Sequence, residues 1–251
     1  MRGAADGALD VIAITDHDTV AAFATAESIG RELKVQVIPA VEVSSTHRDR
    51  DVHVLGYFID PDAPAMKAHA ERAVRRREER MHEMLGRLGA QGIDVAYAAV
   101  EAAAGPDRVV IGRPHLARAL VTAGHASSVP DAFNSLIGDH SPAFVPTHLL
   151  TPVQAVELLL AAAGVPIWAH PPGDLVDELL PDLVRAGLRG LEVYRPRHAP
   201  AKILRYEGIC RSSRLLVSGG SDWHTPDGGT ALGDFFVTAD EVEGLLSAGG
   251  M

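Results

Sequence analysis

The sequence predicts an α/β fold, in which a mainly parallel sheet or barrel is surrounded by helices. Short apolar runs alternate with longer helix-like stretches over most of the 251 residues. This alternation is typical of repeated β-α units. Apolar residues make up 47% of the chain, enough for a large core. The strand-like runs, about seven in number, favour a closed barrel over an open sheet.

The first part of the barrel is predicted from residues 11 to 58. In chain order the expected elements are a strand at 11–14, a helix at 19–33, a strand at 35–38 that ends at 41–43, and a strand at 51–58. The apolar residues of each strand are bounded by turn-forming or polar residues. The 51–58 run alternates around His53, as expected for a strand with one buried face.

A helical stretch then interrupts the β-α rhythm. Residues 62–148 contain a long helix candidate at 65–88, ended by glycines, and a second at 113–121. We therefore predict a barrel domain at 1–61 and 149–251 and an inserted helical subdomain or lid at 62–148. The basic run Arg75-Arg76-Arg77 with Arg80 is interpreted as a solvated helix face, or alternatively as a track for an RNA backbone.

The barrel resumes with short buried strands at 165–169, 190–194 and 215–217. The first of these ends at His170 and the last at Ser221-Asp222-Trp223-His224. Asp222 and His224 are two residues apart, so on an extended backbone both side chains point to the same face. A carboxylate and an imidazole projecting together could begin a divalent-metal site.

The net charge and the cysteine content exclude some classes of function. Lys and Arg total 23 against 33 Asp and Glu, a net charge of −10. Such a chain does not attract nucleic acid through its overall field, so a phosphate-bearing substrate would need local positive charge. The single cysteine, Cys210, excludes an internal disulfide and a cysteine-based zinc site. Without a recognisable secretory signal or membrane-length apolar run, we expect a cytoplasmic protein that binds neither a membrane nor a stable protein partner.

Six metal-competent side chains lie at or near the ends of strand-like runs: His17, Glu42, His53, His170, Asp222 and His224. In a barrel these ends converge on one mouth. Imidazole and carboxylate ligands without thiolate suit Zn, Mn or Fe. Such a cluster could hold a phosphoryl group and activate water near neutral pH.

These residues also carry a family resemblance. The segments Ile14–Thr19, Val41–Val43, Val52–Tyr57, Trp168–Pro171 and Gly219–His224 resemble successive motifs of the PHP (polymerase and histidinol phosphatase) superfamily. Within it the chain most resembles the branch of nucleotide phosphatases and 5′→3′ exoribonucleases. The resemblance implies a distorted (β/α)7 barrel, a site for up to three Mn, Zn or Fe ions, and hydrolysis of phosphate esters.

The resemblance also implies roles for single residues. Glu42 would bridge two of the metals. His53 and His170 would complete the ligands of the first of these, and Asp222 would bind the second. His17 and His224 would bind the third metal. Arg113, His115 and His198 would contact the substrate. Apart from the resemblance, we expect either Asp16 or a metal-site histidine to protonate the leaving oxygen, and the sequence leaves this choice open.

The chain departs from the family pattern at its start. The family opens with a strand ending in His-x-His, followed by an Asp, and no such motif occurs here. We therefore expect the first barrel strand and three ligands to be absent, through either a start codon placed too far downstream or a true truncation. Such a barrel would expose a strand edge at 11–14, so poor expression or aggregation is predicted.

The preferred function is metal-dependent hydrolysis of nucleotide 3′-phosphates or 5′→3′ cleavage of short RNA. Two alternatives remain: a histidinol-phosphate-like phosphatase that acts on small molecules, and an inactive metal-binding paralogue.

Overall fold

The computed structural model describes residues 1–106, 110–224 and 230–251. The chain forms two compact units. The barrel unit comprises residues 1–44, 52–67 and 152–251, and the insert unit comprises 45–51 and 68–151. These bounds lie close to the expected insert at 62–148, but the assignment of two domains stays a prediction.

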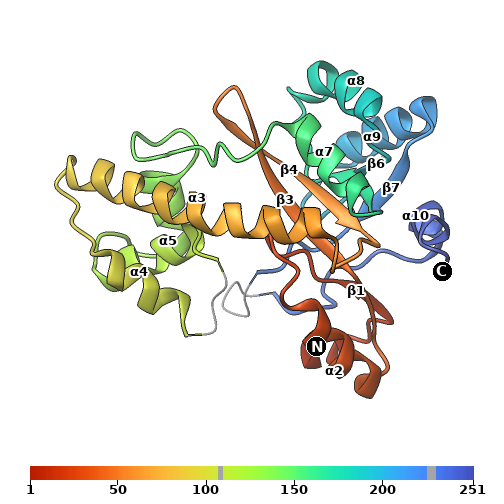
Figure 1. Cartoon of the computed structure of the whole chain (residues 1–251), viewed down its shortest axis with the longest axis horizontal. Helices are drawn as coiled ribbons and strands as arrows, with labels where there is room; N and C mark the ends of the chain where they lie inside the picture. Colours follow the sequence, from red (N-terminus) through yellow and green to blue (C-terminus); the bar gives the residue numbers. More distant parts are fainter. Residues whose placement is uncertain (107–109, 225–229) are drawn as a thin grey trace. The chain divides into compact units, whose positions relative to one another are not determined.

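The strands of the barrel unit form two sheets (Figure 1). In the smaller sheet, β1 (Val11–Ala13) pairs in parallel with β2 (Gln36–Ile38). In the larger sheet the order is β3-β4-β5-β6-β7. Its strands are β3 (Ala40–His47), β4 (Arg50–Tyr57), β5 (Val165–Trp168), β6 (Gly190–Tyr194) and β7 (Leu216–Gly219). Strands β5, β6 and β7 are parallel, as the β-α rhythm predicts.

One part of the sheet departs from the expected parallel order. Strand β4 runs antiparallel to β5, with Val54 opposite Trp168. Strands β3 and β4 are joined by a tight turn at Arg48 and Asp49, both with positive φ. A turn this short can only join antiparallel strands. The predicted strand at 35–43 is also wrong, because it breaks after Ile38 into β2 and β3.

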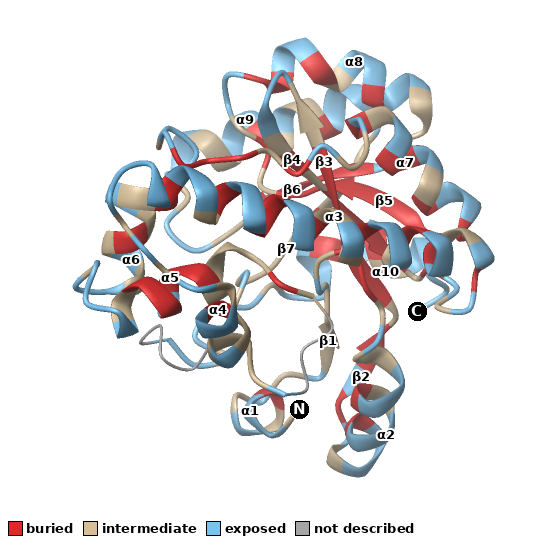
Figure 2. Ribbon diagram, turned by 60° about the vertical axis from the view of Figure 1, so that its left-hand side comes forward, coloured by how far each residue is buried: buried red, intermediate tan, exposed pale blue. Residues whose placement is uncertain are grey.

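The helices of the barrel unit are α1 (Arg2–Asp6), α2 (Phe23–Leu33), α7 (Pro152–Ala161), α8 (Val176–Ala186), α9 (Pro200–Ser213), η3 (Asp240–Val242) and α10 (Glu243–Ala248). Helix α2 begins four residues later than expected, because the segment after β1 is held in a turn at Asp18, with φ 59°. Figure 2 shows β5 buried and the outward faces of α7 and α8 exposed. Ile167, Trp168 and Leu191 are fully buried in this core.

Within the described residues, β1 and β7 each have one edge without a strand partner. Among the described strands, β1 pairs only with β2, and β7 pairs only with β6. The sheet is therefore curled but open between β1 and β7 over the residues the structure describes. This arrangement confirms an α/β barrel-type fold.

The insert unit is helical. Its elements are α3 (Pro64–Gly89), which starts in the barrel unit, α4 (Tyr97–Ala104), α5 (Arg113–Thr122), α6 (Val129–Ala132) and η1 (Phe133–Ile137). Met84, Leu88, Leu116, Leu120 and Ile137 form its fully buried centre. No helix within the described ranges is both long enough and apolar enough to cross a membrane.

The basic run on α3 differs from the solvated face that we predicted. Arg75 is exposed, but Arg77 and Arg80 are only 6% and 5% exposed. The Arg80 guanidinium donates hydrogen bonds to the Val145 carbonyl (2.5 Å) and to the Asp51 carboxylate (3.2 Å). The Arg77 and Arg80 side chains therefore pack inside the insert unit.

Candidate functional site

The candidate site is centred on Glu42 of β3, whose side chain is buried among imidazoles. Its Oε1 lies 2.9 Å from His53 Nδ1 and 3.0 Å from His170 Nε2. Its Oε2 lies 3.9 Å from His17 Nδ1. The structure thus brings three of the predicted ligands, His17, His53 and His170, around a fourth, the Glu42 carboxylate.

Backbone hydrogen bonds position His17 beside Glu42. The two residues form an isolated parallel β-bridge. The Asp18 amide donates to the Glu42 carbonyl (2.9 Å), and the Glu42 amide donates to the Asp16 carbonyl (3.2 Å). The loop after β1 is therefore held against β3, and this pairing places His17 beside Glu42.

The antiparallel β4-β5 pair brings His53 to His170. The Ala169 amide donates to the His53 carbonyl at 3.1 Å. The two imidazoles lie edge to face, with His53 Nδ1 3.2 Å from His170 Nε2. Glu42 lies near the start of β3 and His53 in the middle of β4, so the expectation that the ligands lie at or near strand ends is wrong for His53. Strand β4 of the β3-β4 hairpin pairs with β5, and this pairing brings Glu42 and His53 to His170 at the end of β5.

The charge at Glu42 is stabilised by its neighbours. Burial opposes ionisation, but the charges of His17 and His53 and the hydrogen bonds from His170 and His53 hold the pKa of Glu42 well below its usual range. An ionised buried carboxylate beside imidazole nitrogens is a donor set that Zn, Mn or Fe can use. Donor atoms of His17, Glu42 and His53 lie within 4.8 Å of one another, close enough to share a cation. These residues therefore fit a divalent metal.

Asp222 and His224 follow β7 and contact each other. The His224 Nδ1 lies 2.8 Å from the Asp222 carbonyl and 3.6 Å from its carboxylate. The Asp222 Oδ2 accepts a hydrogen bond from Arg195 (2.5 Å). Burial raises the pKa of Asp16, and the nearby charge of His224 partly opposes this rise. Asp16 thus lies within electrostatic reach of this pair.

The three predicted substrate-binding residues are divided between the units. His198 lies after β6 in the barrel unit, where its Nδ1 is 3.0 Å from the Val193 carbonyl. Burial lowers its pKa, and the charges of nearby Lys202 and Arg195 lower it further. Arg113 and His115 begin α5 in the insert unit. Their roles toward a substrate stay predictions.

Arg113 and His115 are already engaged within the insert unit. Arg113 pairs with Asp139 (2.5 Å) and lies 3.7 Å from the Asp51 carboxylate. Its guanidinium also stacks 4.9 Å from the centre of the Phe144 ring. His115 Nδ1 accepts a hydrogen bond from the Gly112 amide (3.1 Å).

Sequence reasoning missed two charged residues at the site, Glu192 and Arg195. Glu192 lies in the buried strand β6 and is only 5% exposed. Its Oε2 accepts a hydrogen bond from the His170 amide (2.6 Å) and lies 3.5 Å from Arg195 Nε. The sequence signal that could have identified Glu192 is a glutamate inside an otherwise apolar strand.

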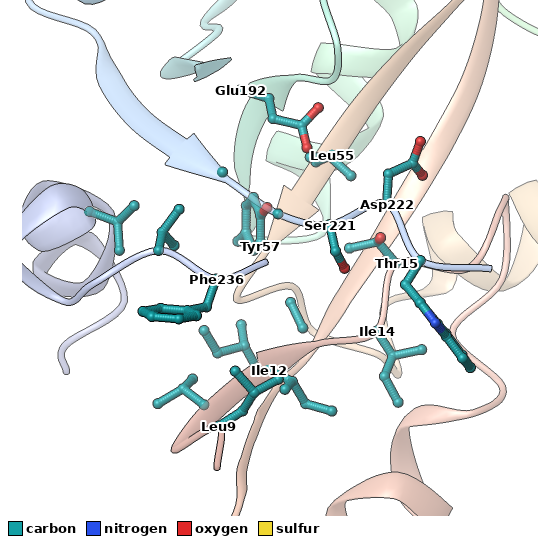
Figure 3. A pocket seen from close by; sticks show the side chains of 18 of the residues that line it. Leu9, Ile12, Ile14, Thr15, Leu55, Tyr57, Glu192, Ser221, Asp222 and Phe236 are labelled. Carbon is teal, nitrogen blue, oxygen red and sulfur yellow. The ribbon is translucent and has the colours of Figure 1, made fainter. Parts of the chain in front are cut away.

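A cavity of about 590 Å³ opens beside these residues (Figure 3). Glu192, Asp222, Ser221 and Thr15 contribute polar groups to its wall. The rest of the wall is largely apolar and includes Leu9, Ile12, Leu55, Tyr57 and Phe236. The cavity therefore joins the predicted metal site to an apolar space bordered by β1 and the segment after β7.

Three known proteins with similar sequences are phosphoester-cleaving enzymes by name. The chain is 31% identical over 239 residues to a 5′-3′ exoribonuclease of Haemophilus influenzae, covering 93% of this chain and 86% of that protein. It is 33% identical over 229 residues to a phosphoribosyl 1,2-cyclic phosphate 1,2-diphosphodiesterase of Eggerthella lenta (89% and 86% covered). It is 30% identical over 230 residues to a 3′,5′-nucleoside bisphosphate phosphatase of Chromobacterium violaceum (89% and 80% covered). No protein-family model matches the chain.

Two solved structures have a similar fold. A chain from Bifidobacterium adolescentis, assigned as a metal-dependent phosphoesterase, superposes with a TM-score of 0.89 at 30% identity, covering 98% of this chain and 88% of that one. An amidohydrolase of Chromobacterium violaceum gives a TM-score of 0.83 at 28% identity, covering 92% and 83%. Fold, site and relatives together define a metal-dependent phosphoesterase. Within that class, the chain belongs to the PHP family.

Proposed function

We propose that this phosphoesterase hydrolyses nucleotide 3′-phosphates or short RNA, using divalent metal ions held by the residues around Glu42. The observation that carries the proposal is the buried Glu42 carboxylate, with His53 and His170 nitrogens at 2.9 and 3.0 Å from one of its oxygens. A carboxylate held ionised in this setting is suited to binding cations rather than to donating a proton.

The substrate class rests on the relatives. Their names specify an exoribonuclease, a phosphoribosyl cyclic phosphate diesterase and a nucleoside bisphosphate phosphatase. A sugar phosphate within a nucleotide or nucleotide-like molecule is the chemistry these activities share. Because the net charge is −10, such anions would be attracted by local positive charge rather than by the overall field of the chain.

The proposed ligands are the predicted set: His17, Glu42, His53, His170, Asp222 and His224. When bound, Mn, Zn or Fe would supply Lewis-acid stabilisation of phosphoryl oxygens and lower the pKa of water. Asp16, whose pKa is raised by burial, could hold the proton needed by the leaving oxygen. Arg113, His115 and His198 are proposed to bind the substrate anion.

Metal content and substrate turnover test the proposal together. The purified chain is stripped with chelator, reloaded with Mn, Zn or Fe, and measured by elemental analysis. It is then assayed for phosphate release from adenosine 3′,5′-bisphosphate and for shortening of a 5′-phosphorylated RNA. We expect bound metal and metal-dependent turnover in the wild type, and a loss of both in His170→Ala and Asp222→Ala, because each change removes a proposed ligand.

Matched controls are His140→Ala and Asp240→Ala, which remove the same groups from exposed positions. Unchanged turnover in both site variants would remove the proposed site. Turnover of histidinol phosphate alone would favour the small-molecule alternative, and turnover of phosphoribosyl cyclic phosphate alone would favour the diesterase activity. Metal binding without turnover of any of these substrates would favour the inactive paralogue.

A further inference from the structure

Two of the proposed ligands, His170 and Asp222, adopt a backbone conformation that ordinary side chains rarely occupy. The φ angles are 32° at His170 and 50° at Asp222. A residue other than glycine is strained in this region and persists there only where surrounding contacts hold it. The contacts of the His170 amide and the Asp222 carboxylate come from Glu192 in β6, which lies between β5 and β7, and from Arg195, the residue after β6.

Glu192 reaches both neighbouring strands from β6. Its Oε2 accepts the His170 amide hydrogen bond at 2.6 Å, on the β5 side. Its Oε1 faces Gly220, on the β7 side, where a Cβ atom would lie 3.8 Å away. The pairing of β6 with β7 shifts register between Glu192 and Tyr194. Irregularities of this kind bend a strand and re-aim its side chains.

Arg195, three residues after Glu192, continues the connection to Asp222. Its Nε lies 3.5 Å from Glu192 Oε2, and a terminal nitrogen donates to Asp222 Oδ2 at 2.5 Å. The Arg195 side chain is only 20% exposed. His170, Glu192, Arg195 and Asp222 therefore form a continuous chain of contacts from the end of β5 to the segment after β7.

We infer that Glu192 and Arg195 are positioning residues that hold His170 and Asp222 in metal-binding geometry. This inference rests on the proposed metal role of His170 and Asp222. Glu192 fixes the His170 backbone and the Arg195 guanidinium, and Arg195 fixes the Asp222 carboxylate while leaving its other oxygen for a cation. Carboxylates that bind metals are commonly oriented by a second hydrogen-bond partner in this way.

A competing account predicts the opposite effect on metal binding. If Arg195 only neutralises Asp222, its positive charge repels a cation, and removing it should tighten metal binding. If Arg195 positions Asp222, removing it should weaken binding by about 10- to 100-fold. The sign of the change in metal affinity therefore separates the two accounts without any measurement of turnover.

The experiment measures metal affinity of the full chain by competition with a chelating dye, using Mn and Zn. We expect Arg195→Gln to weaken at least one site by about 10- to 100-fold, and Arg195→Lys to recover part of the loss. Glu192→Gln, which keeps an acceptor for the His170 amide, should weaken the same site less. The double variant Glu192→Gln, Arg195→Gln should bind metal no more weakly than Arg195→Gln alone, because the Glu192 charge acts on Asp222 through Arg195.

The matched control is Arg205→Gln, which breaks an exposed arginine-carboxylate pair with Asp177 on the neighbouring helices α9 and α8. It should leave metal affinity unchanged. The melting temperature of each metal-free variant separates lost positioning from lost folding. Unchanged or tighter metal binding in folded Arg195→Gln would overturn the inference, whereas a wild-type chain that binds no metal would instead overturn the proposed function.

Discussion

The Asp18 carboxylate accepts a hydrogen bond from the Ser44 amide at 2.8 Å, which ties the loop after β1 to the middle of β3. Both residues are fully buried. This contact lies one residue from His17 and two from Glu42. It therefore fixes the spacing of two proposed ligands from different strands.

Replacing Asp18 with alanine should destabilise the barrel unit and loosen the site. The change leaves the buried Ser44 amide without this acceptor, at a cost of about 1–3 kcal/mol. It also places alanine at φ 59°, where aspartate and asparagine are better tolerated. Urea unfolding should show the loss, and Asp18→Asn should show a smaller one. Equal stability of Asp18→Ala and wild type would contradict this account.

The stability of the metal-free protein should fall as pH rises toward neutrality, because of Glu192. Burial raises its pKa from 4.5 to about 7, an effect that Arg195 and His170 only partly offset. Between these values the folded state binds more protons than the unfolded state, so the free energy of unfolding decreases with increasing pH. The contribution lost by pH 8 is about 3 kcal/mol.

Glu192→Gln should remove this dependence. Denaturant unfolding of the chelated protein at pH 5 and pH 8 would measure it, with the exposed Glu243→Gln as a control. Relative to wild type, Glu192→Gln should gain stability at the higher pH. A constant difference between the two proteins across this range would show that Glu192 does not titrate there.

Arg80→Ala should unfold the insert unit far more readily than Arg75→Ala on the same helix. Burial lowers the pKa of Arg80 to about 10, so the guanidinium is still charged at neutral pH. Its removal would leave the Asp51 carboxylate, only 7% exposed, with Arg113 at 3.7 Å as its remaining cationic partner, at a cost of about 3 kcal/mol. Arg75 is exposed, and its removal should change stability by less than about 0.5 kcal/mol. Thermal unfolding of the two variants would compare them directly.

The open edges of β1 and β7 should make the chain self-associate. Unpaired strand edges beside an apolar cavity favour contacts between copies. Phe236 lines this cavity and is 62% exposed, so Phe236→Ser should reduce association. Leu204 on α9 is 67% exposed and does not line it, so Leu204→Ser is the matched control. Light scattering over a concentration series should show the difference, and a monodisperse wild-type monomer would contradict the expectation.

The sequence predicted the elements of the barrel well where strands are short and apolar. The strand at 190–194 coincides with β6, and the long helix at 65–88 falls within α3. Both have strong local signals: a buried apolar run in one case and glycines at the helix end in the other. The antiparallel pairing of β4 with β5 was not predicted, because an alternating β-α rhythm indicates parallel strands.

The candidate site was only partly predictable. His17, Glu42, His53 and His170 meet as expected, because the types and positions of their side chains carry the signal. The contacts of Glu192 and Arg195 depend on the register shift at the end of β6, which no local pattern reveals. The burial of Arg77 and Arg80 was likewise hidden, because their neutralising and packing partners come from other segments.

The contact between Glu42 and His170 joins residues 128 positions apart in the chain. During synthesis the whole insert must emerge before β5 can pair with β4 and bring His170 to Glu42. Contacts of such long sequence separation form slowly, because loop closure must precede them. We therefore expect metal uptake during refolding to lag behind helix formation, so that the bound ion marks completion of the fold.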